Sequence, residues 1–167
     1  EIVGLEKNIF HEKKCLDAGC GGGRNSIAMS MAGARQVEGI DLGELGIEDA
    51  RNRAKNINIT NVNFQKASIL DIPYQDETFD FVWCAGVVMI TQDPSKALSE
   101  LCRVLKPGGQ LYILVYATGG LRWPLINLLR PFAKILGQEN LEKAIDLSGE
   151  PSNKRRTFLD DLYCPKL

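Results

Sequence analysis

A run of glycines between a short apolar segment and a helical segment constrains this chain more than any other feature of its sequence. Lys14–Ala18 is a short apolar run, and Gly19–Gly23 follows it directly as Gly-Cys-Gly-Gly-Gly. A helical pattern over Arg24–Ala32 comes next and stops at Gly33, a residue type that is common at helix C-termini. A strand, a glycine-rich turn and a helix in this order predict the first crossover unit of a parallel sheet.

The same alternation of short apolar runs and helical patterns continues as far as Tyr116. Four further strands are predicted at Val37–Asp41, Val62–Ala67, Asp80–Ala85 and Gln110–Tyr116, and two further helices at Leu45–Asn56 and Pro94–Lys106. The predicted fold class is therefore α/β, a doubly wound and mostly parallel sheet with its core over 14–116.

The helix predicted over Pro94–Lys106 shows the clearest amphipathic pattern of the chain. An apolar stripe facing the sheet is expected to consist of Leu98, Leu101, Cys102 and Leu105. Pro94 suits the first turn of a helix, and Pro107-Gly108-Gly109 is expected to end the helix and turn the chain into the fifth strand.

The alternating pattern stops after Tyr116. Leu121–Leu136 is apolar with a helical pattern, but two prolines interrupt it. We expect 1–167 to form a single domain in which 117–167 serve as a lid, a substrate-binding segment or an oligomer contact. For Leu121–Leu136 the alternatives are a lid over a pocket, ordinary core packing, or the contact of a homodimer.

Two acids near the glycine run favour a nucleoside ligand that carries a positive charge. Asp17 stands two residues before Gly19, where it suits an ammonium group. Asp41 ends the second predicted strand, where it could accept hydrogen bonds from both hydroxyls of a ribose and could also cap the following helix, since the two roles are compatible. Arg24 takes the place of the last glycine in Gly-x-Gly-x-x-Gly, which argues against a dinucleotide site.

Five stretches of this chain resemble, in order, the motifs of the class I S-adenosylmethionine-dependent methyltransferases. The stretches are Cys15–Arg24, Val37–Leu42, Ala67–Tyr74, Phe79–Val87 and Leu105–Gly109. The resemblance implies a Rossmann-like, seven-stranded fold, of which the sequence shows five strands. It also implies S-adenosyl-L-methionine as the cofactor and methyl transfer to a small-molecule acceptor. A catalytically degenerate binding domain is the alternative, and aminopropyl transfer is disfavoured because Cys84–Thr91 lacks acids.

The resemblance further implies which residues bind the cofactor. They are Asp17 and the backbone of Gly19 at the methionine end, Cys20 and Gly21 in the same loop, Asp41 at the ribose, Leu42, Ser68 and Ile69 around the adenine, and Cys84 beside the sulfonium. The family usually has aspartate where this chain has Ser68, so the hydrogen bond to the adenine amine would lack charge. Met89 stands where many relatives have histidine, so we assign no catalytic residue.

Charge and cysteine spacing narrow the classes of partner. The formal net charge of −1, from 20 basic and 21 acidic residues, lacks the basic excess typical of nucleic-acid-binding proteins. The five cysteines lack the paired spacings of a zinc site or a disulfide framework, and one histidine cannot build a metal site alone. No apolar run is long enough to span a bilayer, and no signal peptide is recognisable. We therefore expect no metal, no membrane span and a cytoplasmic location.

Overall fold

The computed structural model describes residues 8–115 together with positions 128 and 131. The chain falls into two units, Glu1–Tyr116 and Ala117–Leu167. The helices and strands named here, from β1 to β5, all belong to the first unit. The predictions for Leu121–Leu136 and for strands beyond the fifth lie outside the described residues.

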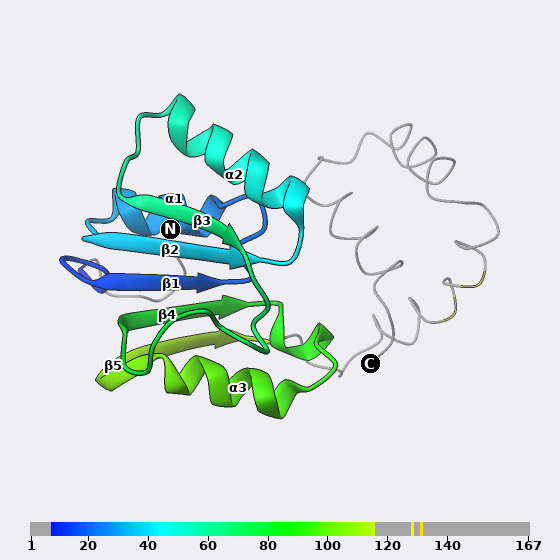
Figure 1. The fold of residues 1–167 in the computed structure, drawn as a ribbon. Helices are drawn as coiled ribbons and strands as arrows, with labels where there is room; N and C mark the ends of the chain where they lie inside the picture. The colour runs from blue at the N-terminus through cyan, green and yellow to red at the C-terminus, as the bar shows by residue number, and fades with distance from the viewer. Residues whose placement is uncertain (1–7, 116–127, 129–130, 132–167) are drawn as a thin grey trace. The chain divides into compact units, whose positions relative to one another are not determined.

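Five parallel strands form one sheet in the order β3-β2-β1-β4-β5, and their arrows all point the same way in Figure 1. Their bounds are β1 Lys14–Ala18, β2 Gln36–Asp41, β3 Val62–Lys66, β4 Phe79–Ala85 and β5 Leu105–Leu114. The strand order reverses between β1 and β4, because β1 pairs with β2 on one side and with β4 on the other. In an open parallel sheet, such a reversal at the carboxyl ends of the strands is where ligands bind.

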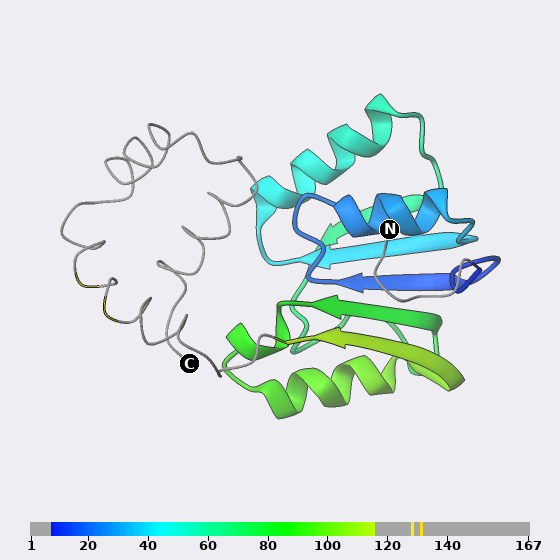
Figure 2. The ribbon, with the colours of Figure 1, turned by 180° about the vertical axis from the view of Figure 1, so that it is seen from behind.

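Helices cover both faces of the sheet, which confirms the doubly wound α/β prediction. Helices α1 (Arg24–Met31) and α2 (Glu44–Asn56) pack on one face, and α1 lies in front of the sheet in Figure 2. Helix α3 (Pro94–Arg103) and the 3-10 turn η1 (Val88–Ile90) pack on the other face. Cys15 and Cys84 are buried in the two cores, one on each face. No helix among the described residues is long and apolar enough to cross a membrane.

The buried stripe of α3 differs from the predicted one. Ala97, Leu101 and Val104 are fully buried, whereas Leu98 and Cys102 are exposed. The helix starts at an N-cap, since the Asp93 side chain accepts a hydrogen bond from the Lys96 amide, and its packing on the sheet turns Ala97 and Leu101 inward. Sequence periodicity favoured the larger apolar residues, which was wrong at Leu98 and Cys102.

The end of α3 also differs from the prediction. The helix ends at Arg103, and β5 begins at Leu105, which pairs with Phe79. Gln110 then pairs with Phe81, so the residues between Leu105 and Gln110 bulge out of β5 rather than forming a turn before it. The amides of Thr78 and Phe79 both donate to the Val104 carbonyl, and these bonds draw the chain into the sheet earlier than expected.

Candidate functional site

The glycine loop after β1 folds back against the end of β2. The amides of Gly19 and Cys20 both donate to the Ile40 carbonyl, at 2.8 and 2.9 Å. Gly19, Gly21 and Gly23 all have positive φ angles, which glycine adopts without the steric cost of a side chain. The loop therefore depends on its glycines for its backbone path and on main-chain hydrogen bonds for its position.

The three glycines have different surroundings. A Cβ atom at Gly19 would collide with the Val87 side chain, and one at Gly23 would lie 2.7 Å from both Ala50 and Phe64. A Cβ atom at Gly21 would meet nothing within 4 Å. Gly19 and Gly23 are therefore required for packing, whereas Gly21 borders open space that a ligand could enter.

Asp41 at the end of β2 is fixed beside that open space. Its Oδ2 accepts a hydrogen bond from the Gly21 amide and its Oδ1 accepts one from the Gly43 amide, both at 2.8 Å. The N-cap of α2 is Gly43, so the helix-capping prediction for Asp41 is wrong. Each carboxylate oxygen keeps a lone pair for a further donor such as a ribose hydroxyl. The next residue, Leu42, is 65% exposed and offers an apolar surface there.

Asp17 in β1 carries an unpaired oxygen in a buried position. Its side chain is 1% exposed, and its Oδ2 accepts a short hydrogen bond of 2.6 Å from the Ser26 hydroxyl. Its Oδ1 has no hydrogen-bond partner among the described residues. Burial raises the pKa of Asp17 to about 6, although the Ser26 hydrogen bond opposes the shift. A buried acceptor without a donor is unusual and indicates a place for a donor, such as a ligand ammonium group or a water molecule.

A sequence model described as a methyltransferase domain matches residues 9–158 of this chain. The chain belongs to the methyltransferase-domain family. Its similarity to a curated relative, 27-O-demethylrifamycin SV methyltransferase of Amycolatopsis mediterranei, is 34% identity over 113 residues, which cover 65% of this chain and 42% of the relative. The chain thus spans about two fifths of that relative's length.

Solved structures place this methyltransferase domain among Rossmann-like folds. YcgJ of Bacillus subtilis matches 93% of this chain and 79% of its own, with a TM-score of 0.65 and 22% identity. The cyclase SpnF matches 62% of this chain and 38% of its own, with a TM-score of 0.60 and 30% identity. A cyclase among the neighbours shows that the fold alone does not determine the reaction.

The remaining predicted site residues of the methyltransferase domain follow β3 or lie near the end of β4. Ser68 opens a tight turn in which its Oγ accepts from the Leu70 amide at 3.1 Å and its carbonyl accepts from the Asp71 amide at 3.2 Å. Ile69 and Cys84 have buried side chains in the core, and burial raises the pKa of the Cys84 thiol to about 11. At these two positions the backbone is the group that a ligand could contact.

The structure brings the nine predicted residues to the carboxyl ends of the strands. Asp17, Gly19, Cys20 and Gly21 follow or end β1, Asp41 and Leu42 end β2, Ser68 and Ile69 follow β3, and Cys84 lies near the end of β4. The amide of Ala67 donates to the Asp41 carbonyl at 3.0 Å, which ties the turn after β3 to the ribose-side acid. The side chain of Cys20 is buried, and its amide and carbonyl are already bonded to Ile40 and Gly23.

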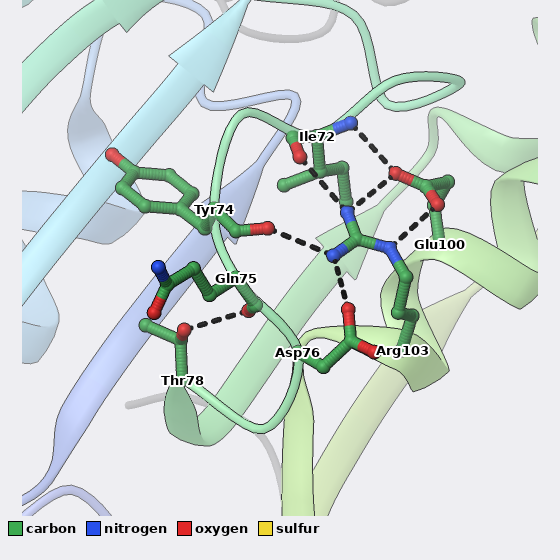
Figure 3. A network of polar contacts seen from close by, with 7 residues as sticks. All are labelled: Ile72, Tyr74, Gln75, Asp76, Thr78, Glu100 and Arg103. Carbon is green, nitrogen blue, oxygen red and sulfur yellow. Dashed lines mark hydrogen bonds and ion pairs between the residues drawn. The ribbon is translucent and has the colours of Figure 1, made fainter.

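The sequence did not predict a polar network around Arg103 (Figure 3). Arg103 at the end of α3 bonds to Glu100 on the same helix and to the connection between β3 and β4. The spacing of Glu100 and Arg103, three residues apart on a helix, is the signal that could have revealed the pair.

One cavity lies away from the carboxyl edge of the sheet, and the described residues contain no metal-binding cluster. A cavity of about 440 Å³ opens between the end of α2 and the start of β3, lined in part by Arg51, Lys55 and Asn58. It lies at the amino end of β3, away from Ser68. In the part of the chain that the structure describes, no group of three or more His, Cys, Asp or Glu residues could hold a metal ion.

Proposed function

We propose that this chain is the cofactor-binding part of an enzyme that transfers a methyl group from S-adenosyl-L-methionine to a small-molecule acceptor. The family supports the reaction class, and the name of the Amycolatopsis relative supports a small-molecule acceptor. The observation that carries the proposal is Asp41, which binds the Gly21 amide beside open space, together with the unpaired Oδ1 of the buried Asp17.

The residues present fit this cofactor at each of its parts. Asp41 is held by two amides with lone pairs to spare, which suits the two hydroxyls of a ribose. The unpaired Oδ1 of Asp17 suits the ammonium group of the methionine end. Leu42 offers an apolar surface for adenine, and Ser68 and Ile69 lie on the neighbouring turn.

The cofactor, when bound, supplies a methyl group already activated on a sulfonium. The contribution of this chain is then to bind and orient it, because alignment of the reacting atoms provides much of the catalysis in such transfers. The cationic ligand also favours the ionised form of Asp17, whose pKa is otherwise raised. The lid or dimer role of 117–167, the single-domain boundary and the cytoplasmic location stay predictions.

Calorimetric titration of the chain with S-adenosylmethionine and its demethylated product tests this proposal. We expect both to bind, and replacement of Asp41 by alanine to weaken binding by about 1–3 kcal/mol through loss of the ribose hydrogen bonds. Glu48→Ala, which removes an exposed carboxylate from α2, is the matched control and should bind normally. Unchanged affinity in Asp41→Ala would contradict the assignment of the ribose site.

The same titration separates the proposal from the degenerate binding domain. Absence of binding by the unaltered chain would favour the alternative function. Binding without methyl transfer would leave the reaction itself in question. Mass spectrometry of candidate hydroxylated acceptors incubated with the protein and cofactor therefore completes the test.

A further inference from the structure

The connection between β3 and β4 contains no helix, although it crosses from one side of the sheet to the other. Residues 67–78 instead form a loop that packs Ile69 and Ile72 into the core on the α3 face. Crossover connections between parallel strands are usually helices, whose backbone hydrogen bonds are internal. This loop has to obtain its hydrogen bonds from other parts of the chain.

The Arg103 side chain supplies several of those bonds from the last turn of α3 (Figure 3). Its Nη1 donates to the Tyr74 carbonyl and to Asp76 Oδ1, both at 2.8 Å, and its Nη2 donates to the Ile72 carbonyl at 2.9 Å. Its Nε and Nη2 donate to the two carboxylate oxygens of Glu100 at 2.7 and 2.8 Å. All five guanidinium donor positions are thus used, in a planar arrangement that lysine cannot reproduce.

Glu100 also binds the backbone of Ile72. Its Oε2 accepts a hydrogen bond from the Ile72 amide at 2.8 Å, while Arg103 binds the carbonyl of the same residue. Both the N–H and the C=O of Ile72 are therefore bound by the Glu100–Arg103 pair. The pair stays charged over the physiological pH range, because the Arg103 guanidinium lowers the pKa of Glu100 to about 2.

The turn that bears Ser68 lies between two hydrogen-bonded positions of the chain, Ala67 and Ile72. On one side the Ala67 amide is bound to the Asp41 carbonyl, and on the other side Ile72 is bound by the pair. Between them, Ser68 and Asp71 form an isolated antiparallel bridge. The Ile69 amide has no hydrogen-bond partner among the described residues. The position of this turn relative to Asp41 therefore depends on the pair.

We propose that Glu100 and Arg103 are positioning residues that hold the Ser68–Asp71 turn in place to recognise the edge of the adenine ring. This inference rests on the proposed function. The exocyclic amine and the adjacent ring nitrogen of adenine present a donor beside an acceptor. Ser68 and the Ile69 amide offer groups that match this pattern. Hypoxanthine reverses the pattern, with a carbonyl beside an N–H.

The test compares the affinities of S-adenosylhomocysteine and S-inosylhomocysteine for the intact chain and two variants. The intact chain should prefer the adenine compound. Arg103→Lys keeps the charge but loses the planar grip, and should reduce this preference by about two- to tenfold, the worth of one hydrogen bond. Glu100→Gln should reduce it in the same direction and serves as the second variant if Arg103→Lys does not fold.

Tyr74→Phe is the matched control, because it loosens the same loop at another point. The Tyr74 hydroxyl donates to Glu38 Oε2 at 2.9 Å and accepts from Gln65 Nε2 at 2.8 Å. This variant should lower the thermal midpoint of unfolding but keep the preference for adenine. An unchanged preference in folded Arg103→Lys and Glu100→Gln, or an equal loss in Tyr74→Phe, would overturn the inference. Failure of the intact chain to bind S-adenosylhomocysteine would instead refute the proposed function.

Discussion

The glycine loop 19–23 and the start of the β3–β4 connection 67–78 lie at the same edge of the sheet but are held in place by different means. The glycine loop is held by hydrogen bonds from its own amides to the Ile40 carbonyl and the Asp41 carboxylate, and its backbone adopts positive φ angles. The β3–β4 connection is held by side chains, above all by Arg103, which is 29 and 31 positions away from the two carbonyls it binds. The glycine loop thus depends on its own main-chain amides and on glycine conformations, whereas the β3–β4 connection depends on side chains of another element. A methyl group added to a glycine should disrupt the glycine loop, and removal of a charge from the Glu100–Arg103 pair should loosen the β3–β4 connection.

The largest effect is expected from Gly23→Ala. The new methyl group would lie 2.7 Å from Ala50 and Phe64, and alanine would be strained at a φ of 73°. Overpacking and backbone strain together should lower the free energy of unfolding by about 2–5 kcal/mol. Urea denaturation measures this loss.

Gly21→Ala is the control for that substitution, since its φ is also positive but its Cβ would meet no atom. It should cost about 1–2 kcal/mol, which is the strain alone. Equal losses in the two variants would show that packing does not distinguish the glycines of this loop.

The next effect concerns the pH dependence of stability at Asp17, beside the glycine loop. Burial raises the pKa of this carboxyl from 3.8 to about 6, so the folded protein favours the neutral form. The resulting stability is fully present below pH 3.8 and is lost as the pH rises to about 6. The loss should total about 3 kcal/mol, at 1.36 kcal/mol for each pKa unit.

Asp17→Asn cannot ionise and should not show this loss in urea titrations at pH 4, 5, 6 and 7. Asp71→Asn, which changes an exposed carboxyl, should behave like the unaltered chain. A profile for Asp17→Asn that parallels the unaltered chain would mean that another group titrates in this range.

The smallest effect is expected from Glu100→Gln in the β3–β4 connection. The pKa of Glu100 is lowered from 4.5 to about 2, mainly by hydrogen bonds from Arg103. The pair therefore contributes its full stability above pH 4.5, and this contribution is lost as the pH falls towards 2. Both side chains are partly exposed, so the loss in Glu100→Gln should be only about 1–2 kcal/mol at pH 7.

The difference in unfolding free energy between Glu100→Gln and the unaltered chain should shrink below pH 4.5. Asp49→Asn, which breaks an exposed ion pair with Arg53, should cost at most about 0.5 kcal/mol. A difference that stays constant down to pH 2 would show that the charge of Glu100 does not stabilise the connection.

The same contrast explains how much could be predicted from the sequence. The five strands and the first two helices were predicted to within a residue or two, except for the start of β5, because short apolar runs and glycines act locally. Asp17 and Asp41 were placed correctly at the ends of their strands for the same reason. The roles of the nine cofactor residues stay predictions.

The bonds from Arg103 to the β3–β4 connection and the bulge in β5 could not be predicted, because both depend on tertiary contacts. The Lys106 ammonium donates to Asp80 Oδ1 at 2.7 Å, and this contact and the pairing of Leu105 with Phe79 exist only once β4 and β5 meet. A helix-ending Pro-Gly-Gly sequence gives no hint that the preceding residues already belong to a strand. The buried stripe of α3 was mispredicted for a related reason, since its rotation is set by the sheet.

The reversal of strand order between β1 and β4 has a consequence for the rate of folding. The Lys14 amide and Asp80 Oδ2, which join these strands at 2.9 Å, are 66 positions apart in the chain. Each half of the sheet forms through shorter crossovers, but the central seam requires closure of this long segment, which is slow because its entropy is lost before any contact compensates for it. We expect the pairing of β1 with β4 to form last. Partly folded chains whose two half-sheets expose unpaired strand edges should then be the species most prone to aggregate during refolding.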